Sequence, residues 1–108
     1  DAELLVSHAR SSTLIVTMED HVLMGGFGSA ALEALSEAGA AAPVCRIGWP
    51  DNFVSHGSSG SDLRADNGLS PEAIEEKILT HYQRTGASLS KPKPANANAH
   101  HAAATLPK

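Results

Sequence analysis

The chain has 108 residues, of which 42% are hydrophobic and only 4% are aromatic. This length allows one small domain with a core of Ala, Leu, Val and Ile, and it is too short to enclose a cofactor cleft with walls of its own. The formal net charge is −4, and all 12 acidic side chains lie within residues 1–85. An acidic body argues against nucleic acid as a partner, because neutralising phosphates requires a basic face.

The cysteine content and the hydropathy pattern narrow further the class of protein to which the chain can belong. The one cysteine, Cys45, excludes an internal disulfide and cannot form a structural zinc site alone. No apolar run approaches the length of a bilayer span, and the first residues lack the layout of a signal peptide. We therefore expect a cytoplasmic protein with no membrane partner, in which Cys45 is a buried small hydrophobe rather than a reactive thiol.

Apolar periodicity and turn residues predict an alternation of helices and strands. In chain order, the elements are expected at residues 1–10 (helix), 13–18 (strand), 26–38 (helix), 44–47 (strand), 61–65 (helical turn) and 71–84 (helix). Helix–strand alternation predicts an α/β fold with a right-handed crossover and a parallel pair of strands. Residues 86–108 are rich in Pro, Asn, Ala, Ser and Lys, so we expect a disordered tail after a domain at residues 1–85.

The last helix carries a clear start signal. Ser70 is well placed as an N-cap, and Pro71 follows it at the first helical position. Within this helix Ile74, Ile78 and Tyr82 recur every four residues and are expected to face inward.

A glycine-rich turn precedes the second helix, with Gly25, Gly26, Gly28 and Ser29. The backbone N–H groups and the dipole of a helix start could hold a phosphate there, and Ser29 adds a hydroxyl. The same glycines would also let the helix pack closely on its strand, and no lysine follows to complete a phosphate loop. Close packing is the favoured interpretation, and an anion site is the alternative.

Two adjacent carboxylates follow the first strand, but neighbours on a strand point to opposite faces, which disfavours a general acid–base pair. The histidines nearby match no zinc-ligand spacing. We therefore assign no catalytic, cofactor-binding or metal-ligating residue. The candidates for an interface with a neighbouring domain or subunit are Glu19, Asp20, His21, Trp49, Asp51 and Phe53.

Three blocks of sequence occur in a characteristic order. They are Glu19-Asp20-His21 with Met24-Gly25-Gly26 and Gly28-Ser29-Ala30, then Ile47-Gly48 with Pro50-Asp51, Phe53 and His56-Gly57, and finally Leu63-Arg64-Ala65 with Gly68-Leu69. Together they resemble the C-terminal domain of the transketolase-like, thiamine-diphosphate-dependent enzymes over about residues 1–84. Within that group, the Trp49-Pro50-Asp51 loop and residues 63–69 resemble the 1-deoxy-D-xylulose-5-phosphate synthases.

This resemblance implies a three-layer α/β domain around a five-stranded, mostly parallel sheet, whose first strands lie upstream of Asp1 and outside this chain. It also implies a homodimeric transferase that uses thiamine diphosphate and Mg²⁺ to condense pyruvate with glyceraldehyde 3-phosphate, releasing CO₂, for isoprenoid and thiamine synthesis. This portion would be a non-catalytic scaffold that contacts the remaining domains of the parent chain and helps form the dimer.

The cofactor motif of such enzymes, Gly-Asp-Gly followed by Asn, does not occur here. We therefore expect no cofactor in this chain and no activity when it is isolated. The alternatives are the C-terminal domain of a transketolase or of a 2-oxo-acid dehydrogenase β subunit, and a stand-alone anion-binding module that uses the glycine-rich turn.

Overall fold

The computed structural model describes residues 1–57 and 59–87, so residues 88–108, most of the predicted tail, lie outside the described part. The elements are α1 (Ala2–Ser11), β1 (Ile15–Val22), α2 (Phe27–Glu37), β2 (Val44–Trp49), α3 (Gly60–Asp66) and α4 (Pro71–Arg84). None of the helices in these ranges has the length and hydrophobicity of a membrane span.

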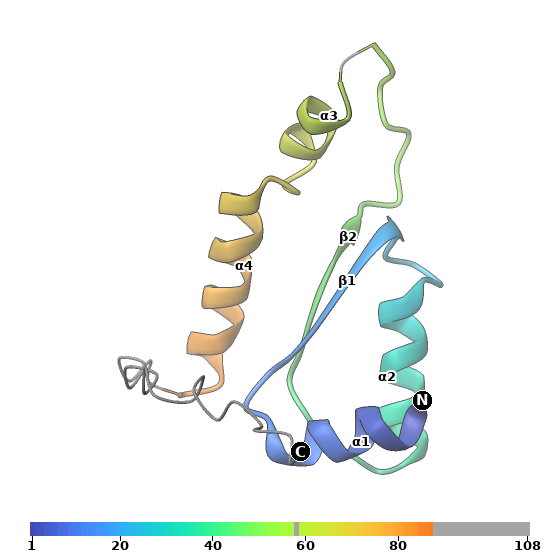
Figure 1. The fold of residues 1–108 in the computed structure, drawn as a ribbon, viewed down its shortest axis with the longest axis vertical. Helices are drawn as coiled ribbons and strands as arrows, with labels where there is room; N and C mark the ends of the chain where they lie inside the picture. Colours follow the sequence, from blue (N-terminus) through green and yellow to red (C-terminus); the bar gives the residue numbers. More distant parts are fainter. Residues whose placement is uncertain (58, 88–108) are drawn as a thin grey trace, which may run out of the picture.

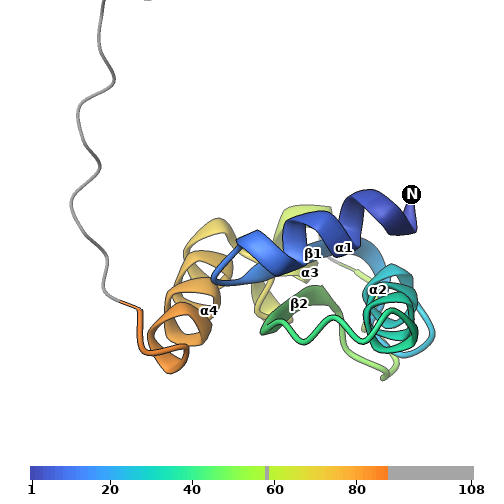
Figure 2. The same cartoon turned by 90° about the horizontal axis from the view of Figure 1, so that it is seen from below.

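The two strands pair in parallel, as their order in the sequence predicts. The register runs from Ile15 opposite Val44 to Met18 opposite Ile47, and after an irregularity it resumes with Val22 opposite Trp49. Seen from below, α2 lies on one side of the strand pair and α4 on the other, while α1 packs against α2 (Figure 1, Figure 2). The predicted α/β fold, with helices on both faces of a parallel sheet, is confirmed.

Small and aliphatic side chains form the core, as the composition predicts. One buried cluster joins Ala9 of α1, Leu35 of α2 and Ala40, with partly buried aliphatic residues packed around it. Cys45 of β2 is fully buried, which confirms the prediction that it is a core residue. The other face of the sheet is less covered, since Met18 of β1 is 60% exposed.

The first strand is longer than the sequence predicts. It begins at Ile15 rather than at residue 13 and continues through Val22, so the predicted end of the strand at residue 18 was wrong. Beyond the strand, the Leu23 amide still donates to the Trp49 carbonyl at 2.9 Å. Acidic residues are poor strand formers, but here both carboxylates find hydrogen-bond donors from other elements.

The last helix begins where predicted, because the Ser70 hydroxyl accepts a hydrogen bond from the Ala73 amide at 3.2 Å and Pro71 is the first helical residue. Ile74 and Ile78 face the sheet as expected, since both line hollows together with Met18 of β1, but they and Tyr82 are only half-buried. The reason is the narrow sheet beneath α4, which has two strands in the described part.

Candidate functional site

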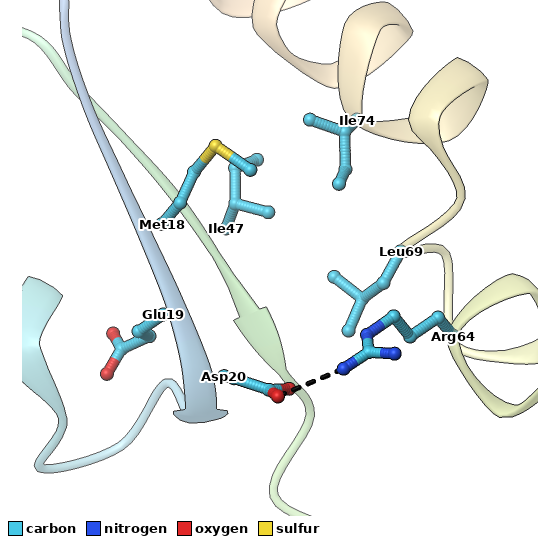
Figure 3. A pocket seen from close by; sticks show the side chains of 7 residues that line it. All are labelled: Met18, Glu19, Asp20, Ile47, Arg64, Leu69 and Ile74. Carbon is cyan, nitrogen blue, oxygen red and sulfur yellow. Dashed lines mark hydrogen bonds and ion pairs between the residues drawn. The ribbon is translucent and has the colours of Figure 1, made fainter. Parts of the chain in front are cut away.

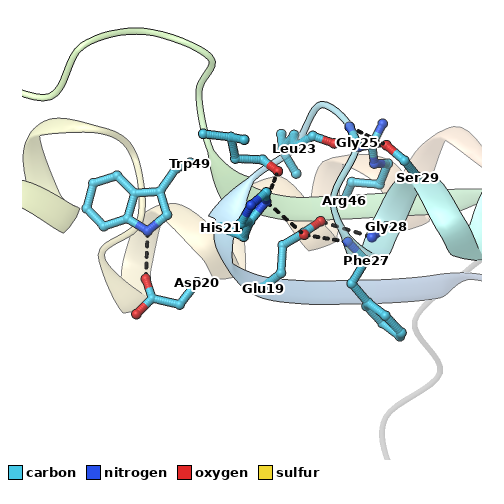
Figure 4. Close-up of polar contacts among 11 residues, drawn as sticks. Glu19, Asp20, His21, Leu23, Gly25, Phe27, Gly28, Ser29, Arg46 and Trp49 are labelled. Carbon is cyan, nitrogen blue, oxygen red and sulfur yellow. Dashed lines mark hydrogen bonds and ion pairs between the residues drawn. The ribbon is translucent and has the colours of Figure 1, made fainter.

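The candidate site lies where the two parallel strands end, the edge at which ligands usually bind in α/β proteins. Glu19 and Asp20 of β1 sit at this edge and point to opposite faces, as Figure 4 shows. Glu19 faces α2, and Asp20 faces Trp49 and α3. The two carboxylates therefore occupy separate environments.

Glu19 binds the start of α2. Its Oε2 accepts a hydrogen bond from the Phe27 amide at 2.6 Å, and its Oε1 accepts one from the Gly28 amide at 2.9 Å (Figure 4). The N-cap residue, Gly26, has no side chain to do this. The hydrogen bond from Gly28, assisted by the one from Phe27, holds the pKa of the Glu19 carboxyl below its ordinary value although burial opposes the shift. A charged carboxylate thus caps the helix dipole from a neighbouring strand.

The glycine-rich turn brings α2 close to the sheet. A Cβ on Gly28 would lie 2.8 Å from both Arg46 Nε and Thr17 Oγ1, which is closer than real side chains approach. Gly25 has a φ of +69°, a left-handed conformation that favours glycine. This geometry supports the close-packing interpretation, and an external anion at these amides would meet the carboxylate of Glu19.

Arg46 was missed by the sequence reasoning. It extends from β2 and donates to the Leu23 carbonyl and, at 2.9 Å, to Ser29 Oγ, while Ser29 Oγ donates to Leu23 at 3.0 Å. A single arginine inside an apolar strand carries no spacing signal, and its partners lie 17 and 23 residues away in the sequence. Arg46 fixes the turn that Ser29 and the glycines form.

Asp20 connects three elements. Its Oδ1 accepts a hydrogen bond from Trp49 Nε1 at 2.6 Å, and its Oδ2 accepts one from Arg64 of α3 at 3.0 Å. These contacts, first the one from Trp49 and then the one from Arg64, hold the pKa of the Asp20 carboxyl below its ordinary value. The ion pair is open to solvent, since the side chains of Arg64 and Asp20 are 48% and 68% exposed.

A shallow hollow of about 270 Å³ lies beside this ion pair. Figure 3 shows Asp20 and Arg64 at one end of it and apolar side chains from the sheet, α4 and the turn before α4 along its walls. These apolar residues are Met18, Ile47, Leu69 and Ile74. The hollow therefore has apolar walls and an ion pair at one end.

The remaining interface candidates are scattered. His21 is exposed, with Nδ1 donating to the Val22 carbonyl at 2.8 Å and lying 4.0 Å from Glu19 Oε2. Asp51 and Phe53 are exposed in the loop after β2, and Phe53 is 106% exposed, so its side chain does not pack onto the domain. Among residues 1–57 and 59–87, no three His, Cys, Asp or Glu side chains gather as metal ligands would.

Thiamine diphosphate does not fit these residues. At the N-terminus of α2, where the glycine-rich turn lies, the Phe27 and Gly28 amides already bind Glu19. A diphosphate placed there would be repelled by that carboxylate.

Comparison with known proteins gives a consistent result. Residues 1–74 match the family described as transketolase, C-terminal domain. The chain is similar to the 1-deoxy-D-xylulose-5-phosphate synthase of Acidobacterium capsulatum, with 51% identity over 85 residues, covering 79% of this chain and 13% of that protein. The protein of the same name from Methylibium petroleiphilum is 47% identical over 95 residues, covering 88% of this chain and 14% of that protein.

A third protein of this name, from Methylacidiphilum infernorum, is 51% identical over 84 residues, covering 75% of this chain and 13% of that protein. The chain thus spans about one seventh of the length of these relatives. The resemblance noted in the sequence is confirmed, and the chain belongs to the transketolase C-terminal domain family.

Proposed function

We propose that this chain is the C-terminal portion of a 1-deoxy-D-xylulose-5-phosphate synthase and serves there as a scaffold without catalytic residues of its own. The observation that carries the proposal is the 51% identity over 85 residues to a protein of that name. In the parent enzyme, pyruvate and glyceraldehyde 3-phosphate would be condensed with release of CO₂. Thiamine diphosphate and Mg²⁺ would be held by the other domains of a cytoplasmic homodimer.

The contacts at the strand ends support a scaffold role. A general acid or base must be able to reach a substrate proton, but the Glu19 carboxylate is only 6% exposed and accepts two backbone hydrogen bonds. Asp20 is bound by Trp49 and Arg64. Both carboxylates hold parts of this domain together, which supports a scaffold role.

A chimera would test this function. Residues 1–85 would replace the matching segment of the Acidobacterium capsulatum synthase, and formation of 1-deoxy-D-xylulose 5-phosphate would be measured. We expect an active, dimeric chimera with at least about a tenth of the parent rate, since exposed differences are usually well tolerated. A matched chimera carrying Gly28→Val should lose dimer and activity together, because α2 could no longer pack on the sheet.

A folded, dimeric chimera without activity would contradict the assignment to this enzyme. A second measurement tests the scaffold claim separately, by titrating thiamine diphosphate and Mg²⁺ into the chain alone in a calorimeter. We expect no binding up to millimolar cofactor, and micromolar binding would show that the chain has a cofactor site of its own.

A further inference from the structure

Helix α3 has little to hold it in place. It lies beyond the carboxyl ends of β1 and β2, and none of its side chains is buried (Figure 1). Segments that bury little surface open locally at low free-energy cost. The contacts that attach α3 to the sheet therefore decide whether it stays there.

The Asp20 carboxylate makes the polar contact between α3 and the sheet. Arg64 Nη2 donates to Asp20 Oδ2 at 3.0 Å, and Figure 3 shows this ion pair at the end of β1. Trp49 Nε1 donates to the other carboxylate oxygen at 2.6 Å, so the tryptophan fixes the orientation of the carboxylate toward α3. An oriented carboxylate binds a guanidinium more strongly than a freely rotating one, because less conformational entropy is lost.

Helix α4 has a contact with the sheet that is separate from the one Asp20 makes with α3. Gly68, which follows α3, has a φ of +72°, a conformation that glycine adopts without strain. Beyond it, α4 has its own attachment to the sheet, since Lys77 Nζ donates to the Arg46 carbonyl at 2.7 Å. The attachments of α3 and α4 are therefore separate.

We propose that α3 is a flap latched by Asp20, and that release of this latch lets α3 leave the sheet and withdraws Arg64 from the end of the apolar hollow lined by Met18, Ile47, Leu69 and Ile74. The closed flap places Arg64 at the end of this hollow. Opening removes the guanidinium from that end of the hollow, with α2, β2 and α4 remaining folded. This device goes beyond a scaffold role, which requires no movement of α3.

Hydrogen exchange of the full chain, measured by mass spectrometry, tests the latch. In Asp20→Asn, amides of residues 61–67 should exchange about two- to fivefold faster than in the wild type, as expected for loss of an exposed ion pair. Peptides from α2 and β2 should keep their rates. The matched control is Asp51→Asn, which removes the same charge from an exposed position in the loop after β2 and should leave α3 unchanged.

Arg64→Gln removes the other partner of the latch and should speed exchange in α3 to the same extent. The double variant with Asp20→Asn should add nothing further, because both changes remove one interaction. Sodium chloride at about 0.5 M should raise the α3 rates of the wild type but not those of Asp20→Asn, since salt screens an exposed pair. If Asp20→Asn fails to fold, Arg64→Gln alone tests whether the ion pair holds α3 on the sheet.

Unchanged α3 exchange in a folded Asp20→Asn or Arg64→Gln variant would overturn the proposal. Exchange that rises equally in α2, β2 and α3 would also overturn it, because α3 would then open only when the whole domain unfolds. Trypsin gives an independent readout, since cleavage after Arg64 requires α3 to open, and Asp20→Asn should be cut there about two- to fivefold faster than the Asp51→Asn control.

Discussion

Glu19 and Asp20 are consecutive residues of β1, yet their carboxylates bind different helices on opposite faces of the sheet. Glu19 binds the start of α2, while Asp20 binds Trp49 of β2 and Arg64 of α3. The alternation of side chains along a strand makes this division possible. A one-residue slip of β1 would exchange the two faces and break both sets of hydrogen bonds.

The pH dependence of stability should reflect both carboxylates. Their pKa values in the folded chain are lowered from ordinary values of 4.5 for Glu19 and 3.8 for Asp20. Their stabilising effect is therefore complete above these ordinary values and is lost as the pH falls through the lowered ones. Thermal unfolding should give a nearly constant melting temperature from pH 7 to about pH 5 and a steep fall below pH 4.5. A melting temperature that rises on acidification would contradict this.

Replacing Glu19 with Gln should separate the contribution of Glu19 to stability from that of Asp20. The Gln amide has one acceptor oxygen where Glu19 has two, so one backbone amide at the start of α2 loses its partner. We expect the melting temperature at pH 7 to fall by about 4–8 °C and the loss of stability in acid to become shallower. Glu33→Gln, at an exposed position on α2, is the matched control and should change neither quantity.

Gly28→Val should destabilise the domain by about 2–4 kcal/mol, because the new side chain would collide with Arg46 and Thr17. Gly28 does not have a positive φ, so the cost comes from steric overlap and not from backbone strain. The control is Ala30→Val, an exposed site in the same helix, which should cost about 0.5 kcal/mol. Equal urea midpoints for the two variants would mean that α2 does not approach the sheet as described.

The thiol of Cys45 should be protected by the fold. It is fully buried, and burial raises the pKa of the thiol, so little reactive thiolate is present at neutral pH. Labelling with an aromatic disulfide reagent should be about a hundredfold slower in buffer than in urea, where the core is open. A thiol introduced by Ser11→Cys in a Cys45→Ala background should react rapidly, because Ser11 is exposed. Rapid labelling of native Cys45 would contradict the buried position of β2.

The parts of the fold that depend on neighbours in sequence could be predicted. Ser70 and Pro71 mark the start of α4 within one turn, and the structure confirms that boundary. The extension of β1 through Val22 could not be predicted in this way, because its carboxylates are bound by donors far along the chain. Trp49 lies 29 residues from Asp20, and Arg64 lies 44 residues away.

In the candidate site, too, features set by neighbouring residues could be predicted, and contacts between distant residues could not. The glycine-rich turn could be predicted because consecutive glycines between a strand and a helix indicate a tight turn. The sequence could not predict that the Glu19 carboxylate caps the start of α2. That prediction requires knowing that Glu19 and not Asp20 faces α2. Arg46 was missed for a related reason, because its role depends on the crossover that brings Leu23 and Ser29 beside β2.

The outer edge of β1 leads to a final prediction. In the described part of the chain, β1 pairs with β2 along one edge, and its other edge has no strand beside it. Val16 and Met18 near this edge are 37% and 60% exposed. A free edge with exposed apolar side chains is a template for pairing with another strand. We therefore expect the chain, when isolated, to form dimers or larger species as its concentration rises.

Sedimentation velocity across a hundredfold range of concentration would detect this association. Val16→Lys should weaken it about tenfold or more, because a lysine beside the edge opposes pairing with a second copy. Leu32→Lys is the matched control, since Leu32 is 40% exposed on α2 and the charge change is the same, and it should leave the association unchanged. A species that stays at 11.2 kDa at every concentration would show that the edge of β1 is not available for pairing. Equal weakening by both lysines would instead place the contact on a surface other than this edge, because only Val16 lies on β1.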